Sequence, residues 1–585
     1  MTSSSQSQKS SASANQRTAV WIVVGLLVVA WLCIYAQVRH FDFLNFDDDM
    51  FLSNNPWLKQ GLTWLSVQWA FTADLFIFSK HAEYWSPITL LSRLVDSEVY
   101  GMNPGAFHVT SACIHLLNAA LLWAALYQLT RTKWRSLAVA ALFLVHPLNV
   151  EPVCWLSARK DLLGATFFFV TLLAYAWYAR QPSTRRYVLL VLAFVAALMA
   201  KPMAITTPLL LFVLDWWPLE RWQNPPVNTA NWRQLIAEKL PVLLLSIGGA
   251  VLAVFSQRNW GAIQDPGQYP FPARVNNALV SYVIYLRRIF WPDDLAIFYP
   301  HPGRALPLAW GVIAFLILVL VSVSAVLLVR RYPFFLSGWI WFGLVLGPVI
   351  GLVQIGDQAM ADRYAYTSVI GIFIVIVWTT AKLLEKQPAI AATGAAIVVL
   401  ALSLVSTAQV RTWKDSETVF THALAVTKNN DLAHLNLGNV YFLRNDFAAA
   451  REQYRQSVAI KPNQFRVWNN LGVVESRLGK QDEATQAYLR ALEINPAERK
   501  SRMALARIFI DRSQPRNAEE LLRQATVAEP NWPDPFFELG KLYAAQSRWT
   551  DAVALWSSYL QTHPGDSAAR QALQNAESAA QTSHQ

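Results

Sequence analysis

The feature that most constrains this chain is a series of long apolar runs separated by short polar loops. Hydrophobic residues make up 54% of the 585 residues and charged residues only 15%, a balance typical of proteins embedded in a bilayer. Such runs satisfy their backbone polar groups in lipid only as helices. The sequence therefore predicts an all-α, polytopic transmembrane bundle of about eleven spans, at residues 18–36, 107–129, 136–146, 162–179, 187–200, 203–217, 240–255, 307–328, 334–353, 369–383 and 390–407.

The first apolar run follows a start, residues 1–17, that is rich in Ser, Gln and Lys. This composition predicts a disordered cytoplasmic tail. Residues 18–36 are long enough to cross a bilayer. They lack a small-residue cleavage site at a suitable position, so we expect a retained first helix rather than a cleaved signal peptide.

Basic residues collect in alternate loops, and this pattern predicts the orientation. Residues 277–292, which include Arg287 and Arg288, would reverse the pattern if they crossed the membrane, so they predict an amphipathic helix on the outer surface. The odd number of spans then puts the C-terminus outside. With a cytoplasmic N-terminus, the positive-inside rule is satisfied by the clusters at residues 131–135, 180–186, 221–239, 330–331 and 382–386.

From residue 411 onward the composition changes and a 34-residue period begins. Small residues where two helices cross, and a proline after the second helix, are typical of tetratricopeptide (TPR) repeats, which stack into an α-solenoid. The residues in register include Gly438, Gly472 and Gly540, then Ala450, Ala484, Ala518 and Ala552, and finally Pro462, Pro496, Pro530 and Pro564.

These patterns predict the domain organisation. The predicted parts are a tail at residues 1–17, a membrane domain at 18–408 with an outer loop at 37–105, a half-repeat or linker at 409–428, four TPR repeats at 429–564, and a capping helix and tail at 565–585.

The net charge of +11 falls mostly in the short loops of the membrane domain, which indicates membrane orientation rather than nucleic-acid binding. The three cysteines, Cys33, Cys113 and Cys154, lie in or beside apolar runs without metal-ligand spacing. They argue against a disulfide framework or a zinc site.

Three consecutive carboxylates, Asp47 to Asp49, stand in the outer loop just after the first span. Carboxylates beside a bilayer repel one another and cost desolvation, so packing alone gives no reason for them. Polar residues from distant parts of the chain fall on the same side, and their convergence predicts one site. These residues are His146, Glu151, Arg159, Lys160, Asp161, Lys201, Asp362, Arg363 and Tyr364.

These residue types suit the transfer of a sugar from a lipid phosphate. A carboxylate at Asp47 or Asp48 can take the proton from an acceptor hydroxyl as its oxygen attacks the anomeric carbon. Basic groups can neutralise the departing phosphate, and a tyrosine can bond the sugar or the phosphate. We expect this binding role for Arg159, Lys160, Lys201, Arg363, Tyr364, His146 and Glu151.

Each cluster also has an ordinary structural interpretation. An acidic pair in a loop is often solvated surface, and an Arg-Lys pair that opens a helix often lies at the interface. His146 can end a helix, and Asp362–Arg363 can be a local ion pair. Only the coincidence of the clusters on one side favours a site.

Taken together, these segments resemble the transmembrane-and-TPR family of O-mannosyltransferase-like proteins, which have a C-type membrane glycosyltransferase fold. The similarity covers nearly the whole chain after the N-terminal tail. It is carried by residues 46–56, 61–63, 69–72, 85–89, 134–136, 146–151, 159–163, 201–202 and 361–364, followed by the repeats.

The resemblance implies an inverting transferase that uses a polyprenyl-phosphate sugar. It implies that Asp47 and Asp48 match the acidic pair of the first outer loop, and that Asp161 matches the acid after the second outer loop. Which of Asp47 and Asp48 takes the proton stays open, because Asp49 makes a triplet. The resemblance also leaves open whether these acids bind a divalent metal.

Our hypothesis is an integral-membrane glycosyltransferase that moves a hexose, such as mannose, to a protein or peptide acceptor docked by the repeats. Animal members of the family that this chain resembles carry long repeat arrays, so by comparison the compact loops and about four repeats favour a bacterial inner-membrane protein with periplasmic repeats. In a eukaryote the equivalent location is the endoplasmic reticulum membrane with lumenal repeats. The alternatives are a non-catalytic TPR scaffold for envelope assembly and an O-antigen ligase-like enzyme that relies on outer His and Arg.

Overall fold

The structure, a computed structural model, describes residues 2–73, 85–222, 232–259 and 267–583. It divides into two compact units, Met1–Lys428 and Asn429–Gln585. Among the described residues, the sole sheet is a two-stranded antiparallel pair of β1 (Tyr299–Pro300) and β2 (Gln358–Met360), and the rest of the regular structure is helical. The expected all-α fold class is confirmed.

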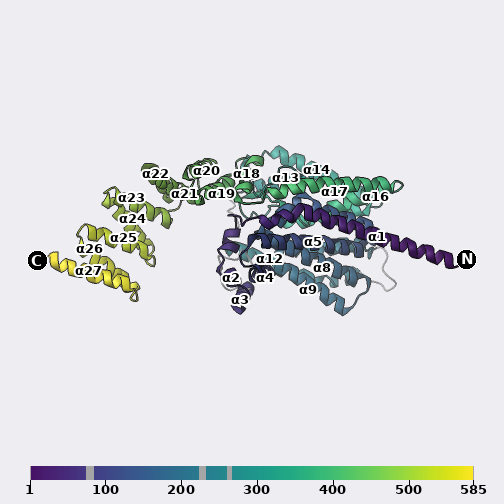
Figure 1. The fold of residues 1–585 in the computed structure, drawn as a ribbon, viewed down its shortest axis with the longest axis horizontal. Helices are drawn as coiled ribbons and strands as arrows, with labels where there is room; N and C mark the ends of the chain where they lie inside the picture. Colours follow the sequence, from purple (N-terminus) through teal and green to yellow (C-terminus); the bar gives the residue numbers. More distant parts are fainter. Residues whose placement is uncertain (1, 74–84, 223–231, 260–266, 584–585) are drawn as a thin grey trace. The chain divides into compact units, whose positions relative to one another are not determined.

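The first unit is a bundle in which long apolar helices run side by side (Figure 1). Its main helices are α1 (Thr2–Tyr35), α5 (Pro104–Thr130), α6 (Lys133–Val145), α8 (Arg159–Arg180), α9 (Thr184–Ala200), α10 (Thr207–Trp216), α11 (Trp232–Ala237), α12 (Leu240–Asn259), α13 (Phe271–Phe290), α14 (Leu308–Leu327), α15 (Pro333–Leu346), α16 (Val369–Leu383), α17 (Pro388–Arg411) and α18 (Ser416–Val426).

Fewer helices qualify as membrane spans by length and composition than the sequence suggested. Among the described residues, six segments are long and apolar enough to cross a membrane, or seven if α6 and its bent continuation count as one. The expected eleven spans are therefore not confirmed. The difference arises because α9, α10, α15 and α16 have only 17, 10, 14 and 15 residues, and a helix needs about 20 residues to cross the apolar core by itself.

Short turns connect the bundle helices and the outer loop. They are η1 (Ala36–His40), η2 (Asp49–Ser53), η3 (Pro147–Asn149), α7 (Val150–Cys154), η4 (Leu156–Ala158), η5 (Pro202–Thr206), η6 (Gly303–Ala305), η7 (Gly347–Val349) and η8 (Asp362–Ala365).

Arg180 attaches the end of α8 to the end of α5. The Arg180 guanidinium at the end of α8 donates to the carbonyls of Gln128 and Leu129 near the end of α5, at 2.6 and 3.0 Å. Part of the predicted basic cluster at 221–239, residues 223–231, lies outside the described residues.

The outer loop contains three helices, α2 (Pro56–Lys59), α3 (Trp64–Thr72) and α4 (Pro87–Tyr100). The Asn55 side chain accepts a hydrogen bond from the Trp57 N–H and so caps α2, as expected for an Asn before an N-terminal proline. Thr63 and Ser66 form a reciprocal capping box that starts α3. Residues 74–84 of the predicted loop lie outside the described residues.

Helix α13 carries its polar side chains toward the protein. Asn277 Nδ2 donates to the Ala359 carbonyl at 2.9 Å, and the Tyr285 hydroxyl donates to the Ala361 carbonyl at 2.8 Å. Helix α13 has 20 residues but is not among the candidate membrane spans. The polar contacts attach it to the segment that leads into η8.

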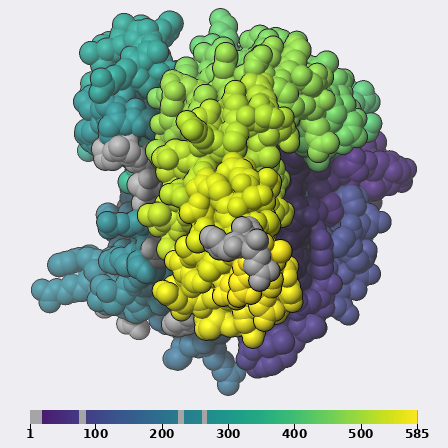
Figure 2. All heavy atoms as spheres, turned by 90° about the vertical axis from the view of Figure 1, so that its left-hand side faces the viewer, coloured from purple at the N-terminus to yellow at the C-terminus, as the bar shows by residue number. Residues whose placement is uncertain are grey.

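The second unit consists of paired antiparallel helices, which confirms the predicted TPR solenoid. Figure 2 shows their side chains as a continuous run in sequence order from green to yellow. The helices are α19 (Asp431–Leu443), α20 (Phe447–Ile460), α21 (Phe465–Arg477), α22 (Gln481–Ile494), α23 (Arg499–Asp511), α24 (Pro515–Ala528), α25 (Pro533–Ala545), α26 (Trp549–Thr562) and α27 (Ser567–Ser583).

Glycines of the repeats lie where the two helices of a pair cross. A Cβ atom at Gly472 would lie 2.6 Å from the Tyr488 ring, and the same relation holds between Gly438 and Tyr454. Real Cβ contacts are not this short, so a larger residue would push the helices apart. The 34-residue period therefore records a packing requirement.

We predict that Gly472→Ala destabilises a fragment of residues 429–585 by about 1–3 kcal/mol, because overpacking at a tight crossing has this cost. Urea denaturation followed by circular dichroism measures the change. Gly565→Ala is the matched control, since no heavy atom lies within 4 Å of a Cβ at that position. Equal stability of the two variants would contradict the crossing argument.

Candidate functional site

Asp48 joins the outer loop to the start of α8. Its Oδ1 accepts hydrogen bonds from the Ser157 N–H at 2.9 Å and the Ser157 hydroxyl at 2.6 Å, and its Oδ2 accepts one from the Leu44 N–H at 3.2 Å. The side chain is fully buried. Burial raises the pKa of Asp48 to about 7, although the hydrogen bonds oppose the shift. Asp48 is therefore engaged on both oxygens.

The neighbouring Asp47 differs in conformation and in surroundings. Its φ of 66° lies in the left-handed region, which is unfavourable for a residue with a side chain. It is half-buried. Desolvation raises the pKa of Asp47, while the charges of Lys160 and Arg363 oppose the rise. The Asp47 carboxylate thus stands in a cationic environment at the end of the bundle.

Asp161 and Lys201 form a buried ion pair between α8 and the residue before η5. The Asp161 Oδ2 atom has no hydrogen-bond partner among the described residues. The Lys201 ammonium lies 6.0 Å from the centre of the Tyr364 ring. A cavity of about 30 Å³ touches Asp161, Lys201 and Arg363, which is room for a water molecule. Three of the predicted site residues therefore share one small space.

Arg363 is fixed by Glu151. The Glu151 Oε1 accepts from the Arg363 guanidinium at 2.5 Å, and its Oε2 accepts from the Arg363 N–H at 2.8 Å. The guanidinium also lies 4.8 Å from the centre of the Trp155 ring and 5.0 Å from that of Tyr364. This two-point contact orients Arg363 between α7 and η8.

Trp155 connects this pair to the acidic loop. Its indole N–H donates to the Phe46 carbonyl at 3.1 Å, and its ring stacks on Phe46 with centroids 5.2 Å apart. Trp155 therefore contacts both Phe46, the residue before Asp47, and the Arg363 guanidinium.

Asp362 holds η8 against α13. It accepts from Arg288 at 3.2 Å and from the Tyr299 hydroxyl at 2.8 Å. Burial raises the pKa of Asp362 to about 6. The adjacent residues Asp362 and Arg363 therefore pair with different elements and not with each other, contrary to the local ion-pair interpretation.

Two predicted binding residues lie in structural contacts. The fully buried Arg159 pairs with Asp96 and donates to the Phe107 carbonyl at 2.6 Å. His146 Nδ1 accepts from the Leu148 N–H at 3.2 Å, so His146 caps the turn after α6. These contacts favour the structural interpretation of both residues.

Sequence reasoning missed Ser157, Asp96 and Arg288 as partners of the site. Ser157 and Asp96 carry no motif, and only their contacts with Asp48 and Arg159 identify them. Arg288 had a signal, the charged end of an amphipathic helix, but its partner Asp362 is 74 residues away.

The residues that the structure describes contain no group of three or more His, Cys, Asp and Glu that could hold a metal ion. The acidic residues of the site are spread among different cationic and hydrogen-bond partners instead. The divalent metal that the resemblance left open therefore has no matching ligand set among them.

The apolar bundle, the cluster of carboxylates and cations, and the helical repeats define a polytopic membrane protein with a C-terminal TPR array. Profiles described as "TPR repeat" and "Tetratricopeptide repeat" match residues 438–479, 465–497 and 503–567. The crystal structure of YrrB, a TPR protein, is 18% identical, covers 33% of this chain and 96% of that one, and has a TM-score of 0.24.

Most of the chain is similar to protein O-mannosyl-transferases. TMTC3 of Mus musculus is 22% identical over 510 residues, which are 79% of this chain and 55% of that protein. TMTC1 of Homo sapiens is 23% identical over 502 residues, which are 77% of this chain and 56% of that protein. These matches confirm the resemblance to the transmembrane-and-TPR proteins. The chain spans about half the length of these curated relatives.

We predict strong coupling between Glu151 and Arg363. Either Glu151→Ala or Arg363→Ala leaves a buried charge unpaired, which destabilises by about 3–5 kcal/mol. The double variant should be less destabilised than the sum by about 1–3 kcal/mol. Denaturation of the detergent-solubilised chain gives the four free energies of unfolding.

The exposed pair Arg287–Asp293, 2.7 Å apart, is the matched control for this cycle. Its coupling should stay below about 1 kcal/mol, because solvent screens exposed ion pairs. Additive effects of the Glu151 and Arg363 substitutions would contradict the buried pair.

Proposed function

We propose that this chain is an integral-membrane glycosyltransferase. It moves a hexose, such as mannose, from a polyprenyl phosphate to a hydroxyl of a protein or peptide on the outer side of the membrane. The observation that carries this proposal is the half-buried Asp47 carboxylate within electrostatic range of Lys160 and Arg363. The similarity to proteins named protein O-mannosyl-transferases supports it.

Asp47 acts as the general base. Its carboxylate takes the proton of the acceptor hydroxyl while the hydroxyl oxygen forms a bond to the anomeric carbon. The bond from that carbon to the phosphate oxygen breaks, and the phosphate leaves with the electron pair. A single displacement of this kind inverts the anomeric centre. The raised pKa of Asp47 makes it a stronger base than a solvated carboxylate.

Lys160, Lys201 and Arg363 neutralise the leaving phosphate. Arg presents two parallel donors to phosphate oxygens, and Lys acts as a compact charge. The Tyr364 hydroxyl accepts from Gln358 at 3.0 Å and keeps its own proton to donate to the sugar. These four side chains are the proposed donor-binding residues.

The other acidic residues position this machinery. Asp48 fixes the backbone next to Asp47, Glu151 orients Arg363, and Asp161 orients Lys201. This division of roles differs from the sequence hypothesis, in which Asp48 and Asp161 were catalytic. Both oxygens of Asp48 and one oxygen of Asp161 are engaged by protein donors, so we assign both residues to positioning.

The repeats follow α18, which is bonded to the acidic loop. The Asn45 N–H donates to the Ser416 hydroxyl at 2.9 Å, and the Asp42 N–H donates to the Lys414 carbonyl at 3.1 Å. We therefore assign the repeats to the same side of the membrane as Asp47, the periplasm of a bacterial inner membrane. There the solenoid docks the acceptor chain.

Replacing the base should abolish transfer. We predict that Asp47→Asn lowers the transfer of labelled mannose from a polyprenyl phosphate to an acceptor peptide by about 10²–10⁴-fold, the usual contribution of a general base. Asp49→Asn is the matched control, because this exposed neighbour should keep near wild-type activity. Full activity of Asp47→Asn would exclude Asp47 as the base.

The pH dependence of transfer tests the same residue. The reaction needs the deprotonated Asp47 carboxylate, so the rate should fall as the pH drops through the pKa of Asp47. Because burial raises that pKa, the fall should begin above the value of about 4 that is usual for an Asp carboxyl. A rate that is flat down to pH 4 would contradict the assignment.

Deletion of the gene should remove a hexose-sized adduct from one or more envelope proteins. Intact-mass and glycan profiling of strains with and without the gene measures this change. An unchanged glycan profile, together with an Asp47→Asn strain that keeps the wild-type phenotype, would favour the TPR scaffold instead.

A further inference from the structure

Helix α18 contacts the loop segment that leads into Asp47. The Ser416 hydroxyl at the start of this helix accepts a hydrogen bond from the Asn45 N–H at 2.9 Å. Further along the helix, the Phe420 ring meets the Phe46 ring edge to face, with centroids 6.2 Å apart, which is a favourable aromatic geometry. Ser416 is 371 positions from Asn45 along the chain. Helix α18 therefore joins a distant part of the sequence to the two residues before Asp47.

Helix α18 is itself anchored. The Asp415 side chain accepts a hydrogen bond from the Thr418 N–H at 2.8 Å and so caps the start of the helix. The His422 Nε2 atom donates to the Leu295 carbonyl at 2.9 Å, and the Gln409 side chain donates to the same carbonyl at 3.3 Å. A capped and anchored helix is a fixed support for the side chains that reach the loop.

The aromatic residue of α18 follows the register of the repeats. Phe420 lies 34 residues before Tyr454. Within its repeat, the Tyr454 ring packs on Gly438 of the partner helix. In α18, the fully buried Phe420 packs on Phe46 of the outer loop. The position that joins two helices in a repeat therefore joins α18 to the segment before Asp47.

The backbone at Asp47 needs support from both sides. Its φ of 66° is unfavourable for a residue with a side chain and persists only when the surrounding structure holds it. On one side, Asp48 is bonded to Ser157. On the other side, Phe46 is held by Trp155, which donates to its carbonyl and stacks on its ring, and by α18. Loss of the α18 contacts would let this segment move and carry the Asp47 carboxylate with it.

We propose that α18 positions the general base, with Ser416 and Phe420 as the positioning residues. They hold the two residues before Asp47, so that its carboxylate stays where it can reach the acceptor hydroxyl. Both side chains act through the loop and not on the substrate. The proposal rests on the proposed function and adds the helix that keeps the base in place.

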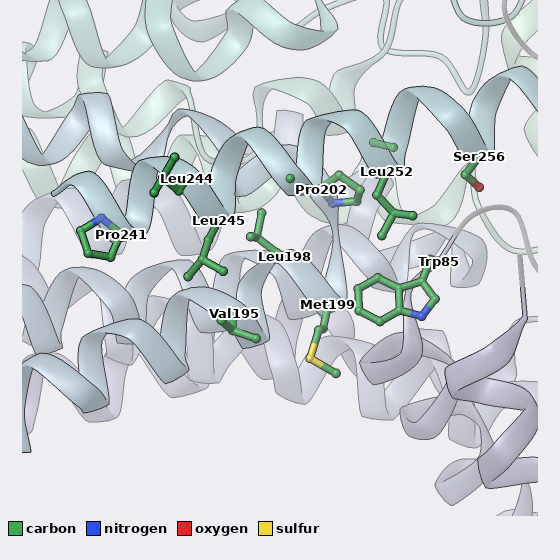
Figure 3. A pocket seen from close by; sticks show the side chains of 13 residues that line it. Trp85, Val195, Leu198, Met199, Pro202, Pro241, Leu244, Leu245, Leu252 and Ser256 are labelled. Carbon is green, nitrogen blue, oxygen red and sulfur yellow. The ribbon is translucent and has the colours of Figure 1, made fainter. Parts of the chain in front are cut away.

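A cavity of about 650 Å³ lies elsewhere in the first unit, between α9 and α12. Figure 3 shows Val195 and Met199 from α9 facing Leu245 and Leu252 from α12 across the space. None of the described residues that line this cavity belongs to α18 or to residues 42–48. Substitutions in α18 therefore leave its walls unchanged, and their effects report on the contact with the loop.

The test is the effect of Ser416→Ala on the full-length chain in phosphatidylcholine nanodiscs, because this change removes the acceptor of the Asn45 N–H. The kcat for transfer of labelled mannose from a polyprenyl phosphate to an acceptor peptide should fall about 10-fold, since a misplaced catalytic group loses much of its effect. The KM for both substrates should stay at the wild-type value, because Ser416 binds neither. Phe420→Leu, which removes the aromatic edge but keeps an apolar side chain, should lower kcat in the same way.

Two further variants complete the series. Ser416→Thr keeps the hydroxyl and should retain most of the wild-type kcat. Thr421→Ala is the matched control, because it removes an exposed hydroxyl from the same helix, and it should behave as the wild type does. A wild-type kcat for Ser416→Ala or for Phe420→Leu would overturn the proposal, and so would a change confined to KM.

Hydrogen exchange measures the contact without any activity. The Asn45 amide should exchange about 10-fold faster in Ser416→Ala than in the wild type, because it loses its hydrogen-bond acceptor. Thr421→Ala should leave this exchange unchanged. A lower kcat without faster exchange would overturn the proposal, since the loss of activity would then not come from the loop.

The proposed function fails separately. Loss of transfer in Asp47→Asn, together with full activity of Ser416→Ala, would reject the positioning role and leave the transferase standing. Full activity of Asp47→Asn would reject the base and the positioning role with it. A wild-type chain that transfers no sugar would reject the transferase, while hydrogen exchange would still report the contact between α18 and the loop.

Discussion

A buried carboxylate fixes the outer loop of this protein to its membrane bundle. Asp48 accepts two hydrogen bonds from Ser157, a residue 109 positions away, and one from Leu44 in its own loop. A buried carboxylate without donors is strongly unfavourable, so loop and bundle are stable in one relative position. Asp47, whose backbone is in the left-handed region, is held in place by this contact, because the next residue, Asp48, is anchored.

Buried ion pairs extend the same principle around the site. Arg159–Asp96 links α8 to α4, Lys201–Asp161 links η5 to α8, and Arg363–Glu151 links η8 to α7. Each charge is compensated where water is scarce. The Arg363–Glu151 pair also holds a cation within electrostatic range of Asp47, so a contact that stabilises the bundle also shapes the proposed donor site.

Features that depend on local pattern could be predicted from the sequence. The 34-residue period predicted the repeats because a small residue must stand where the two helices of a pair cross, as Gly472 does against Tyr488. The span count was not confirmed because helices such as α10 are too short to qualify as spans, and hydropathy cannot separate apolar residues buried against neighbouring helices from those that contact lipid. Arg159 and His146 were expected to bind substrate because a sequence does not show which way a side chain points. Their contacts with Asp96 and Leu148 direct them into the fold.

The sequence by itself determined the membrane class and the repeats, because hydropathy and periodicity act over neighbouring positions. The tertiary structure alone decided how Asp47 and Asp48 differ. Asp48 accepts hydrogen bonds from Ser157, which is 109 positions along the chain, whereas Asp47 stays half-buried near Arg363. The Arg363 guanidinium is in turn held by Glu151, 212 positions away. Asp47 and Asp48 are adjacent and chemically identical, so only the side chains that pack around each of them can make them differ.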